Sequence, residues 1–221
     1  MSSAPPDGAL EEALFATGHV GVAGVDEVGR GAWAGPLSVG VALVTPETLR
    51  ALPAGIRDSK QLSPRAREAL FCPLSRALAG FAVAHASARE CDALGMTAAQ
   101  ALAASRALEL LGVEPDVVVV DGPRDFTQAR EVRCLVGADR LAVSVAAASV
   151  LAKVTRDRHM VALAARLPGY GLERHKGYAS REHREAVAAL GLSDEHRQSW
   201  SVAPAPATRA GSLNLAAMPA T

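Results

Sequence analysis

The sequence predicts an α/β fold in which helices cover a mixed β-sheet. Apolar, valine-rich segments come early in the chain, and from residue 88 onward helical segments alternate with strand-like ones. That order is typical of a sheet with helices on its faces. The clearest strand is the four-valine run at 117–120, which predicts a strand covered on both faces in an interior, parallel position. With 221 residues the chain is long enough to bury a sizeable core.

Three strands and one helix are predicted before residue 88. Apolar residues run through 19–25 and again, with several valines, through 37–44. Ser63 is a favourable N-cap residue and is followed by a proline, so a helix is expected over 64–79. Residues 81–87 alternate in the manner of a strand.

From residue 88 onward the chain is predicted to be mainly helical. A loop rich in Gly, Tyr and His at 168–178 precedes Ser180, a favourable N-cap residue for the last helix. Helices are expected at 88–94, 97–111, 144–167 and 181–190, and a further strand within 135–143, around Asp139. Three parts follow: a flexible N-terminal arm at 1–17, a folded domain with C-terminal helices at 18–201, and a disordered Pro/Ala/Ser-rich tail at 202–221.

The net charge of zero hides an uneven distribution. Residues 1–60 carry seven acidic and four basic side chains, whereas residues 123–184 carry twelve basic and six acidic ones. An acidic end that holds cations and a basic segment that holds a polyanion suit a metal-dependent nuclease. Solvated helix faces are the alternative explanation for many of these basic residues.

Cysteine usage and hydropathy limit the class of protein. Cys72, Cys91 and Cys134 are odd in number and widely spaced, so neither a disulfide framework nor a zinc site is indicated, and a cytoplasmic location is expected. The first 20 residues lack the basic start and apolar core of a secretory signal. No run approaches the ~18 apolar residues of a membrane span, so no membrane partner is expected.

Carboxylates follow two of the predicted strands. Asp26 and Glu27 end an apolar run and lead into Gly29-Arg30-Gly31, and Asp121 ends the four-valine strand. Taken singly, each is explained by an ordinary turn. Together they place carboxylates at the ends of two central strands, where α/β sheets usually carry their sites.

Such a cluster is electrostatically unfavourable unless cations compensate it. Two Mg²⁺ or Mn²⁺ ions about 3.5–4 Å apart would do so, and would activate a water and stabilise the leaving oxygen of a phosphodiester. No His or Cys is spaced to favour zinc. A third or fourth acid is required, and Asp139 and Asp157 are the candidates. The glycines of 29–31 allow close approach to a phosphate or hydroxyl, although an exposed tight turn explains them equally well.

The chain carries six short motifs in a characteristic order. They are Val25-Asp26-Glu27-Val28-Gly29-Arg30-Gly31, Ala34-Gly35-Pro36, Asp58-Ser59-Lys60-Gln61-Leu62, Val120-Asp121-Gly122, the run from Ala147 to Asp157, and His175-Lys176-Gly177-Tyr178. In these motifs and their spacing the chain resembles ribonuclease HII, the type 2 ribonuclease H family, over about residues 21–191. The resemblance implies a ribonuclease H-like mixed β-sheet flanked by helices, with a helical C-terminal part, and makes 18–201 the catalytic domain.

The resemblance also implies a set of four metal-binding, catalytic carboxylates: Asp26, Glu27, Asp121 and Asp139. Asp139 follows Asp121 by the expected 18 residues, and Asp157 would be structural. The family usually has Lys-Gly-Asp at the last of these acids, whereas this chain has Gly137-Ala138-Asp139-Arg140. The missing lysine leaves a local phosphate contact open, and Arg140 is the candidate replacement.

Six further residues would bind substrate on the same resemblance. Gly29, Arg30 and Gly31 would sense the ribose 2′-hydroxyl at an RNA–DNA junction. Tyr178 would pack against the deoxyribose on the DNA side, and a loop aromatic that fills a groove is its alternative interpretation. Lys60 and Lys153 would contact backbone phosphates, and for Lys153 the alternative is an exposed helix lysine.

The implied activity is that of an endoribonuclease that uses Mn²⁺ or Mg²⁺. It would cleave RNA in RNA–DNA hybrids and 5′ to single ribonucleotides in duplex DNA, with 3′-hydroxyl and 5′-phosphate ends, and it would act as a monomer. Ribonuclease HIII is the nearest alternative, but only about 18 residues precede the first strand, too few for its usual N-terminal domain. A non-catalytic nucleic-acid-binding module would not need four carboxylates, and a nucleotide switch protein would need GxxxxGK[ST], which the chain lacks.

Overall fold

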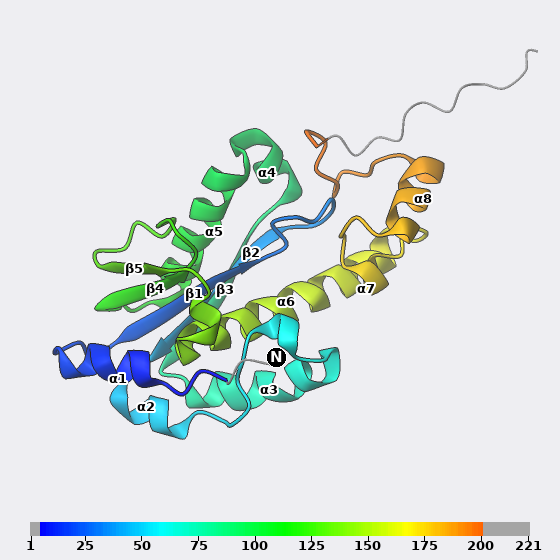
Figure 1. Ribbon diagram of the computed structural model, residues 1–221. Helices are drawn as coiled ribbons and strands as arrows, with labels where there is room; N and C mark the ends of the chain where they lie inside the picture. The colour runs from blue at the N-terminus through cyan, green and yellow to red at the C-terminus, as the bar shows by residue number, and fades with distance from the viewer. Residues whose placement is uncertain (1–4, 201–221) are drawn as a thin grey trace, which may run out of the picture.

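Five strands form one mixed sheet in the order β3-β2-β1-β4-β5 in the computed structural model, which describes residues 5–200 (Figure 1). β1 pairs antiparallel with β2 and parallel with β4, β2 pairs antiparallel with β3, and β4 pairs parallel with β5. The mixed sheet is therefore confirmed, including the interior, parallel position of the four-valine strand. The strands are β1 (Val22–Val28), β2 (Leu37–Val44), β3 (Gly80–Ala86), β4 (Val117–Asp121) and β5 (Val132–Leu135).

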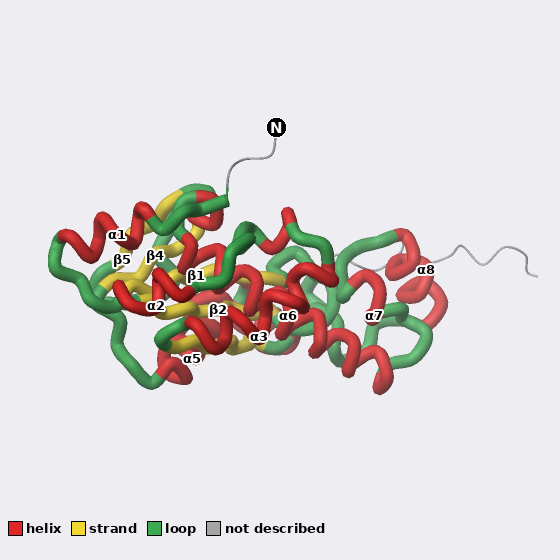
Figure 2. The backbone as a smooth tube through the Cα atoms, turned by 90° about the horizontal axis from the view of Figure 1, so that it is seen from below, coloured by secondary structure: helices red, strands yellow, loops and turns green. Residues whose placement is uncertain are grey.

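Helices cover both faces of the sheet. α6 and α3 pack on one face and α5 on the other. α1 lies at one end of the molecule, and α7 and α8 lie at the opposite end (Figures 1 and 2). The α-helices are α1 (Ala9–Ala16), α2 (Pro46–Ala51), α3 (Pro64–Ala77), α4 (Ala88–Leu94), α5 (Met96–Leu111), α6 (Val143–Arg166), α7 (Leu172–His175) and α8 (Arg181–Leu190). Two short 3₁₀ helices are η1 (Ser59–Gln61) and η2 (Ala138–Arg140).

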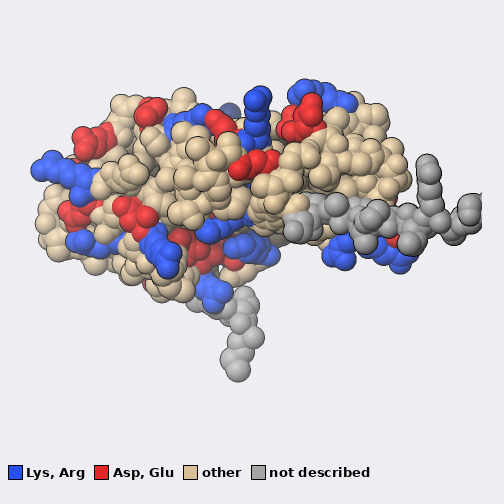
Figure 3. Space-filling view, turned by 90° about the horizontal axis from the view of Figure 1, so that it is seen from above, with Lys and Arg blue, Asp and Glu red and all other residues tan. Residues whose placement is uncertain are grey.

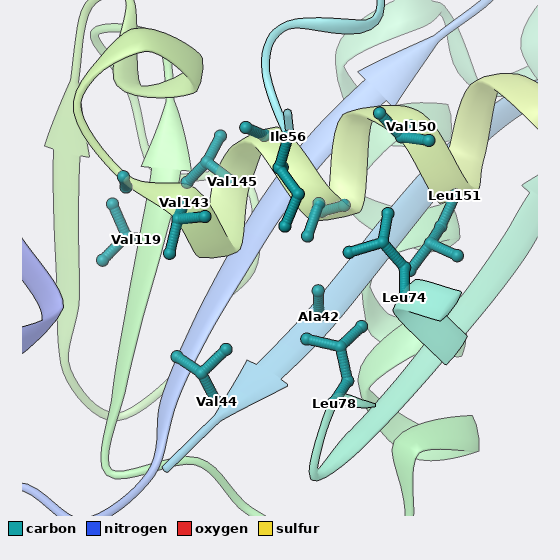
Figure 4. Packing of buried hydrophobic residues seen from close by; sticks show 14 of the residues in the cluster. Ala42, Val44, Ile56, Leu74, Leu78, Val119, Val143, Val145, Val150 and Leu151 are labelled. Atoms are coloured by element: carbon teal, nitrogen blue, oxygen red, sulfur yellow. The ribbon is translucent and has the colours of Figure 1, made fainter. Parts of the chain in front are cut away.

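The strands divide their side chains between the two helical layers. Because successive strand residues point to opposite faces, Val22 and Val119 lie in the layer of α6. Val25 and Val118 lie in the layer of α5. All four side chains are fully buried, and each such burial contributes about 1.5–3 kcal/mol. Figure 4 shows the first layer, in which side chains of α6, of the strands and of the end of α3 pack together.

α6 crosses the sheet in backbone contact with two glycines. A Cβ atom at Gly24 of β1 would lie 2.2 Å from the carbonyl carbon of Ser144 and 2.2 Å from the nitrogen of Val145. A Cβ atom at Gly40 of β2 would lie 2.7 Å from the oxygen of Ala148. The glycines thus form a track that lets α6 lie directly on the two central strands.

Helix α1 ties the N-terminal segment to the start of α6. The Glu11 side chain is fully buried, and its Oε1 accepts hydrogen bonds from the backbone nitrogen of Ser144 at 2.9 Å and from its hydroxyl at 2.6 Å. Ala142, the N-cap residue of α6, makes no side-chain capping bond, so Glu11 satisfies a helix donor from a distant part of the chain. The expected flexible arm at 1–17 is therefore corrected in part, because residues 9–16 form a helix held by this contact.

Replacing Glu11 by Ala is expected to lower the free energy of unfolding by about 1–3 kcal/mol, because the Ser144 donors stay buried without an acceptor. Glu11→Gln keeps an acceptor oxygen and should lose much less. Urea unfolding followed by circular dichroism measures both variants. Equal losses in the two would contradict the capping role.

Two predicted boundaries near acids are wrong. β1 continues to Val28, so Asp26 and Glu27 lie within the strand and not after it. The strand expected within 135–143 does not form: β5 ends at Leu135, and Asp139 lies in η2. The left-handed backbone of Gly137, with φ of 74°, ends the extended conformation between them.

The remaining predicted helices and strands agree with the sequence to within two residues. α2 follows a capping box at Thr45 and was not predicted. The loop expected at 168–178 contains α7, and the first strand is displaced as described above. The tail expected at 202–221 lies outside the described residues.

Candidate active site

Three of the predicted carboxylates lie at the carboxyl ends of two neighbouring parallel strands. Val25 of β1 pairs with Val120 of β4, so the residues that follow them, Asp26 and Asp121, lie side by side at one edge of the sheet. Asp26 is buried, and its Oδ1 accepts a hydrogen bond from the nitrogen of Glu27 at 2.8 Å. Glu27 points to the opposite face of the sheet, because strand side chains alternate.

Asp121 draws the fourth predicted carboxylate to the same place. Its Oδ1 accepts hydrogen bonds from the nitrogens of Gly137 and Ala138, both at 2.9 Å. These bonds hold the turn after β5 against the end of β4. Asp139 follows directly and is buried. Asp139 therefore reaches the site through a turn that another acid of the site anchors.

The charge of Asp26 is poorly compensated by the protein. Its pKa is raised to about 7, first of all by burial, and Glu27 and Asp121 add to the shift. A hydrogen bond to Ser149 of α6 and the charge of Lys60 act in the opposite direction. The pKa shift indicates a carboxylate held in a dry, negatively charged setting.

The neighbouring acids show the same effect. Burial raises the pKa of Glu27, with Asp121 adding to the shift and Arg30 opposing it. Burial also raises the pKa of Asp139, and the charges of Asp58 and Asp121 add to it. Asp121 thus acts on all three of the other predicted carboxylates, which places the four in one electrostatic cluster.

Lys60 lies among these acids. Burial disfavours its ammonium group, but the charges of four carboxylates outweigh burial and raise the pKa of Lys60. They belong to Asp26, Asp58, Asp139 and Asp121. Asp58 also caps η1, because its Oδ1 accepts a hydrogen bond from the backbone nitrogen of Lys60 at 2.9 Å.

The donor set fits hard divalent cations. Carboxylate oxygens are the ligands that Mg²⁺ and Mn²⁺ prefer, and cations would offset the burial and the mutual repulsion that raise these pKa values. Among residues 5–200, no three Asp, Glu, His or Cys side chains stand close enough to form a ready ligand shell.

The turn at 29–31 continues directly from β1 and is held by a buried arginine. Arg197 donates hydrogen bonds to the carbonyl oxygens of Arg30 and Gly29, both at 2.6 Å. The Arg30 side chain donates to Oε1 of Gln100 on α5 at 2.9 Å. A Cβ atom at Gly31 would meet no atom within 4 Å, so packing within the protein does not require a glycine there. Open space beside a backbone is what close approach of a ligand needs.

Tyr178 lies beside this turn. Its hydroxyl accepts a hydrogen bond from the nitrogen of Gly29 at 3.2 Å, and its side chain is 36% exposed. Lys153 Nζ and Arg156 Cζ lie 5.7 Å and 5.5 Å from the centre of its ring. The ring is therefore positioned by the turn and by two cations while part of it stays accessible.

Lys153 is not an exposed helix lysine, which corrects one of the alternatives. Its side chain is 18% exposed, its Nζ lies 2.7 Å from Oδ1 of Asp157, and burial lowers its pKa. A groove of about 650 Å³ runs past Lys153 and Tyr178 between α3, α6 and α7. The groove carries five basic side chains, those of Arg67, Lys153, Arg158, Arg174 and Lys176.

Charged side chains are intermingled on the face drawn in Figure 3. Lys and Arg lie between Asp and Glu there, and the described residues on this face form no large patch of one sign. Binding of a polyanion to this face would therefore depend on local contacts.

Sequence reasoning missed the residues that hold the site together. The Ser149 hydroxyl lies beside Asp26 and lowers the pKa of that acid, and it is 2.9 Å from Oγ of Ser59, a contact that fastens η1 to α6. Arg156 and Arg197 are fully buried and donate to backbone oxygens around the turn. Arg156 stands in the charged stretch 153–159 and Arg197 in a polar segment, so the local sequence marked neither as a buried support.

Comparison with known proteins identifies the family. A sequence model of ribonuclease HII matches residues 23–203. The chain belongs to the ribonuclease HII family. Ribonuclease HII of Streptomyces avermitilis is 45% identical over 203 residues, which cover 91% of this chain and 86% of that protein.

Two solved structures share the fold of this ribonuclease HII family member. Ribonuclease H2 from Pyrococcus horikoshii OT3 matches with a TM-score of 0.71 and 32% identity, over 82% of this chain and 94% of that one. Bst-RNase HIII in complex with Mn²⁺ matches with a TM-score of 0.67 and 23% identity, over 84% of this chain and 68% of that one.

Membership of the ribonuclease HII family confirms the resemblance, the predicted fold and the predicted class of activity. That class is a metal-dependent endoribonuclease that cleaves RNA in RNA–DNA hybrids and at embedded ribonucleotides. The roles of individual residues stay predictions. In the described part of the chain, no helix combines the length and the apolar character needed to cross a bilayer.

Proposed function

We propose that the protein cuts the phosphodiester 5′ to a ribonucleotide in duplex DNA, and RNA in RNA–DNA hybrids, by water attack at the carboxylate cluster. The products would carry 3′-hydroxyl and 5′-phosphate ends, because the 2′-hydroxyl is recognised and is not the nucleophile. One observation carries the proposal. The cluster of Asp26, Asp121 and Asp139 lies at the same edge of the sheet as the turn at 29–31, to which Tyr178 is bonded.

In this proposal Asp26, Glu27, Asp121 and Asp139 hold Mg²⁺ or Mn²⁺. Bound ions would supply an activated water and a stabilised leaving oxygen. The carboxylate donor set and the raised pKa values of Asp26, Glu27 and Asp139 support this assignment. The Mn²⁺ held by Bst-RNase HIII, which has a similar fold, is compatible with the same metals here.

Sugar recognition is assigned to the turn at 29–31 and to Tyr178. Backbone groups of the turn and the Arg30 side chain, which Gln100 orients, would bind the 2′-hydroxyl. A deoxyribose at that position would leave those polar groups unpaired, and such loss discriminates strongly. The Tyr178 ring would pack against the deoxyribose that follows.

Two lysines are proposed to contact the nucleic-acid backbone. Lys60 lies among the acids and would meet a phosphate near the scissile bond. Lys153 lies in the basic groove beside Tyr178 and would meet a phosphate on the DNA side. We further propose a monomer that acts in the cytoplasm, in keeping with the free thiols of the three cysteines.

The test is cleavage of end-labelled duplexes that carry one ribonucleotide, a long RNA–DNA hybrid, or DNA alone, with Mg²⁺ or Mn²⁺. We expect one metal-dependent cut 5′ to the single ribonucleotide and none in the all-DNA duplex. A wild-type protein that cuts neither ribonucleotide-containing duplex would contradict the proposal.

Tyr178→Ala is expected to lower cleavage at the single ribonucleotide at least about tenfold relative to the long hybrid, because only the former presents a deoxyribose beside each ribose. Tyr178→Phe keeps the ring and is the matched control, with a ratio close to that of the wild type. Rates on the two substrates, measured side by side, give the ratio. An unchanged ratio in Tyr178→Ala would remove Tyr178 from junction recognition.

A further inference from the structure

Two buried histidines lie behind the loop at 176–180, which carries Tyr178, and have no part in the chemistry described above. His183 lies in α8 and His196 follows that helix, and both side chains are at most 1% exposed. The two Nε2 atoms lie 3.0 Å apart. Buried imidazoles at this distance form a hydrogen bond only if one ring donates and the other accepts.

The neighbouring backbone decides which ring donates. The nitrogen of Ser193 donates to Nδ1 of His196 at 3.1 Å, so the proton of a neutral His196 lies on Nε2 and points at His183. His183 then accepts at Nε2 and carries its own proton on Nδ1. That Nδ1 lies 3.0 Å from the carbonyl oxygen of Tyr178 and donates to it. A directed chain of hydrogen bonds therefore runs from Ser193 through both rings to Tyr178.

Both rings are held neutral in this chain. Burial lowers the pKa of His196 to about 4, with the nearby His183 adding to the shift. Burial also lowers the pKa of His183, and the ring of His175 is stacked on it at 4.3 Å between centres. Protonation would set an N–H group against another N–H group, so one tautomer of each ring is retained.

The same loop is fixed from its other side. The carbonyl oxygen of Gly177 accepts hydrogen bonds from the nitrogens of Trp33 and Ala34, at 2.8 Å and 3.2 Å. Arg156 links the loop to the segment after β1, because it donates to the oxygens of Lys176 and Pro36. The histidine pair bonds to Tyr178 itself, whose carbonyl oxygen also accepts a hydrogen bond from the nitrogen of Ser180 at 2.8 Å and whose nitrogen donates to the oxygen of His175 at 3.0 Å.

We propose that His183 and His196 are positioning residues for junction selection: they hold the Tyr178 backbone so that its ring stands against the turn at 29–31. This inference rests on the proposed function and extends it to residues that touch no substrate. Removing the hydrogen bonds of the two histidines displaces the Tyr178 ring. The displacement reduces the preference for a single ribonucleotide over a long hybrid. The carboxylate cluster lies on other elements, so cleavage of the long hybrid is retained.

His183→Leu is compared with His183→Asn, whose side-chain amide can still donate to the Tyr178 oxygen. The readout is the ratio of kcat/KM for a duplex with one ribonucleotide to that for a long hybrid. We expect His183→Leu to lower this ratio about tenfold, with hybrid cleavage within about twofold of wild type. His183→Asn should restore most of the ratio. A Leu variant that lowers both rates equally, or an Asn variant no better than Leu, would show a merely structural role and overturn the inference.

A double variant shows whether His183 acts through Tyr178. In a Tyr178→Ala background, His183→Leu should produce no further fall in the ratio. A further tenfold fall would overturn the inference. If His183→Leu does not fold, His196→Leu and His196→Gln form the second pair, because Gln keeps an N–H group near the Nε2 position, and the same two comparisons decide. Wild-type protein that cuts neither substrate would overturn the proposed function and this inference with it, whereas wild-type selectivity that persists in the Leu variant would overturn the inference alone.

Discussion

Asp26→Asn is expected to lower metal-dependent cleavage at least about 10³-fold and, in the absence of metal, to make the protein more stable. Asn has the same shape and keeps an oxygen for the Glu27 nitrogen, but it carries no charge to bind a cation. It also removes a buried charge from a cluster in which Glu27 and Asp121 repel it. Activity and stability should therefore change in opposite directions.

The gain in stability should depend on pH in a defined window. The pKa of Asp26 is about 7 in the folded protein, against an ordinary value of 3.8, so the folded state binds more protons between these values. The contribution of Asp26 to stability is thus present below about pH 4 and is lost as pH rises through about 7. The Asn variant does not titrate. In EDTA, the free energy of unfolding of the Asn variant should exceed that of the wild type by almost nothing at pH 4 and by up to about 4 kcal/mol above pH 7.

Thermal and urea unfolding in EDTA at several pH values measure the change in stability. Cleavage assays with Mn²⁺ measure the change in activity. Excess Mn²⁺ should raise the Tm of the wild type more than that of the variant, because the ion binds the folded state. Asp194→Asn, at an exposed position, is the control and should change neither property. Full activity of Asp26→Asn would overturn the metal assignment, and lower stability above pH 7 would contradict the electrostatic account.

Gly24→Ala is expected to lower the free energy of unfolding by at least about 3 kcal/mol. The added Cβ atom would lie 2.2 Å from backbone atoms of Ser144 and Val145, and neither a helix backbone nor a central strand can give way cheaply. α6 would have to lift from β1, and with it the Ser149 hydroxyl that bonds to Asp26. Activity should fall together with stability.

Gly21→Ala is the matched control, because its Cβ atom would make only ordinary van der Waals contacts. The nearest atom would belong to the Leu43 side chain, at 3.5 Å, and two atoms of Asp116 would lie farther away. Gly21→Ala should stay within about 1 kcal/mol of wild type. Urea unfolding of the two variants gives the comparison, and a Tm lower by about 10 °C is expected for Gly24→Ala alone. Similar, small losses in both would mean that α6 has room to move off the sheet.

Local sequence signals predicted most of the fold because the same residues that mark a helix or strand in the sequence also stabilise it in the structure. Ser63 and Ser180 cap the helices they were expected to cap, and the valines of β4 are buried on both faces. Asp139 was placed in a strand because apolar residues surround it. In the folded chain, the nitrogen of Gly137 donates a hydrogen bond to the Asp121 side chain, and the segment forms a turn. The periodicity of the sequence does not indicate this contact.

The carboxylates of the site were predictable, but their supports were not. Asp26 and Asp121 directly follow apolar runs, which marks them in the sequence. Glu11 lies 133 residues from the helix that it caps, and Arg197 lies 168 residues from the Gly29 oxygen that it binds. Contacts over such separations depend on the finished topology, so no local pattern announces them.

The sheet order also bears on how the protein is made. During synthesis β1, β2 and β3 leave the ribosome first and pair with near neighbours in the chain, whereas β4 becomes available to β1 only after α5 has been made. Asp26 therefore spends the early part of synthesis without Asp121 or Asp139 beside it. Repulsion between Asp26 and these two acids can therefore arise only after β1, β2, β3 and α5 have been made. α6 follows all four carboxylates in the chain, so the helix that covers this face of β1 is made only after them.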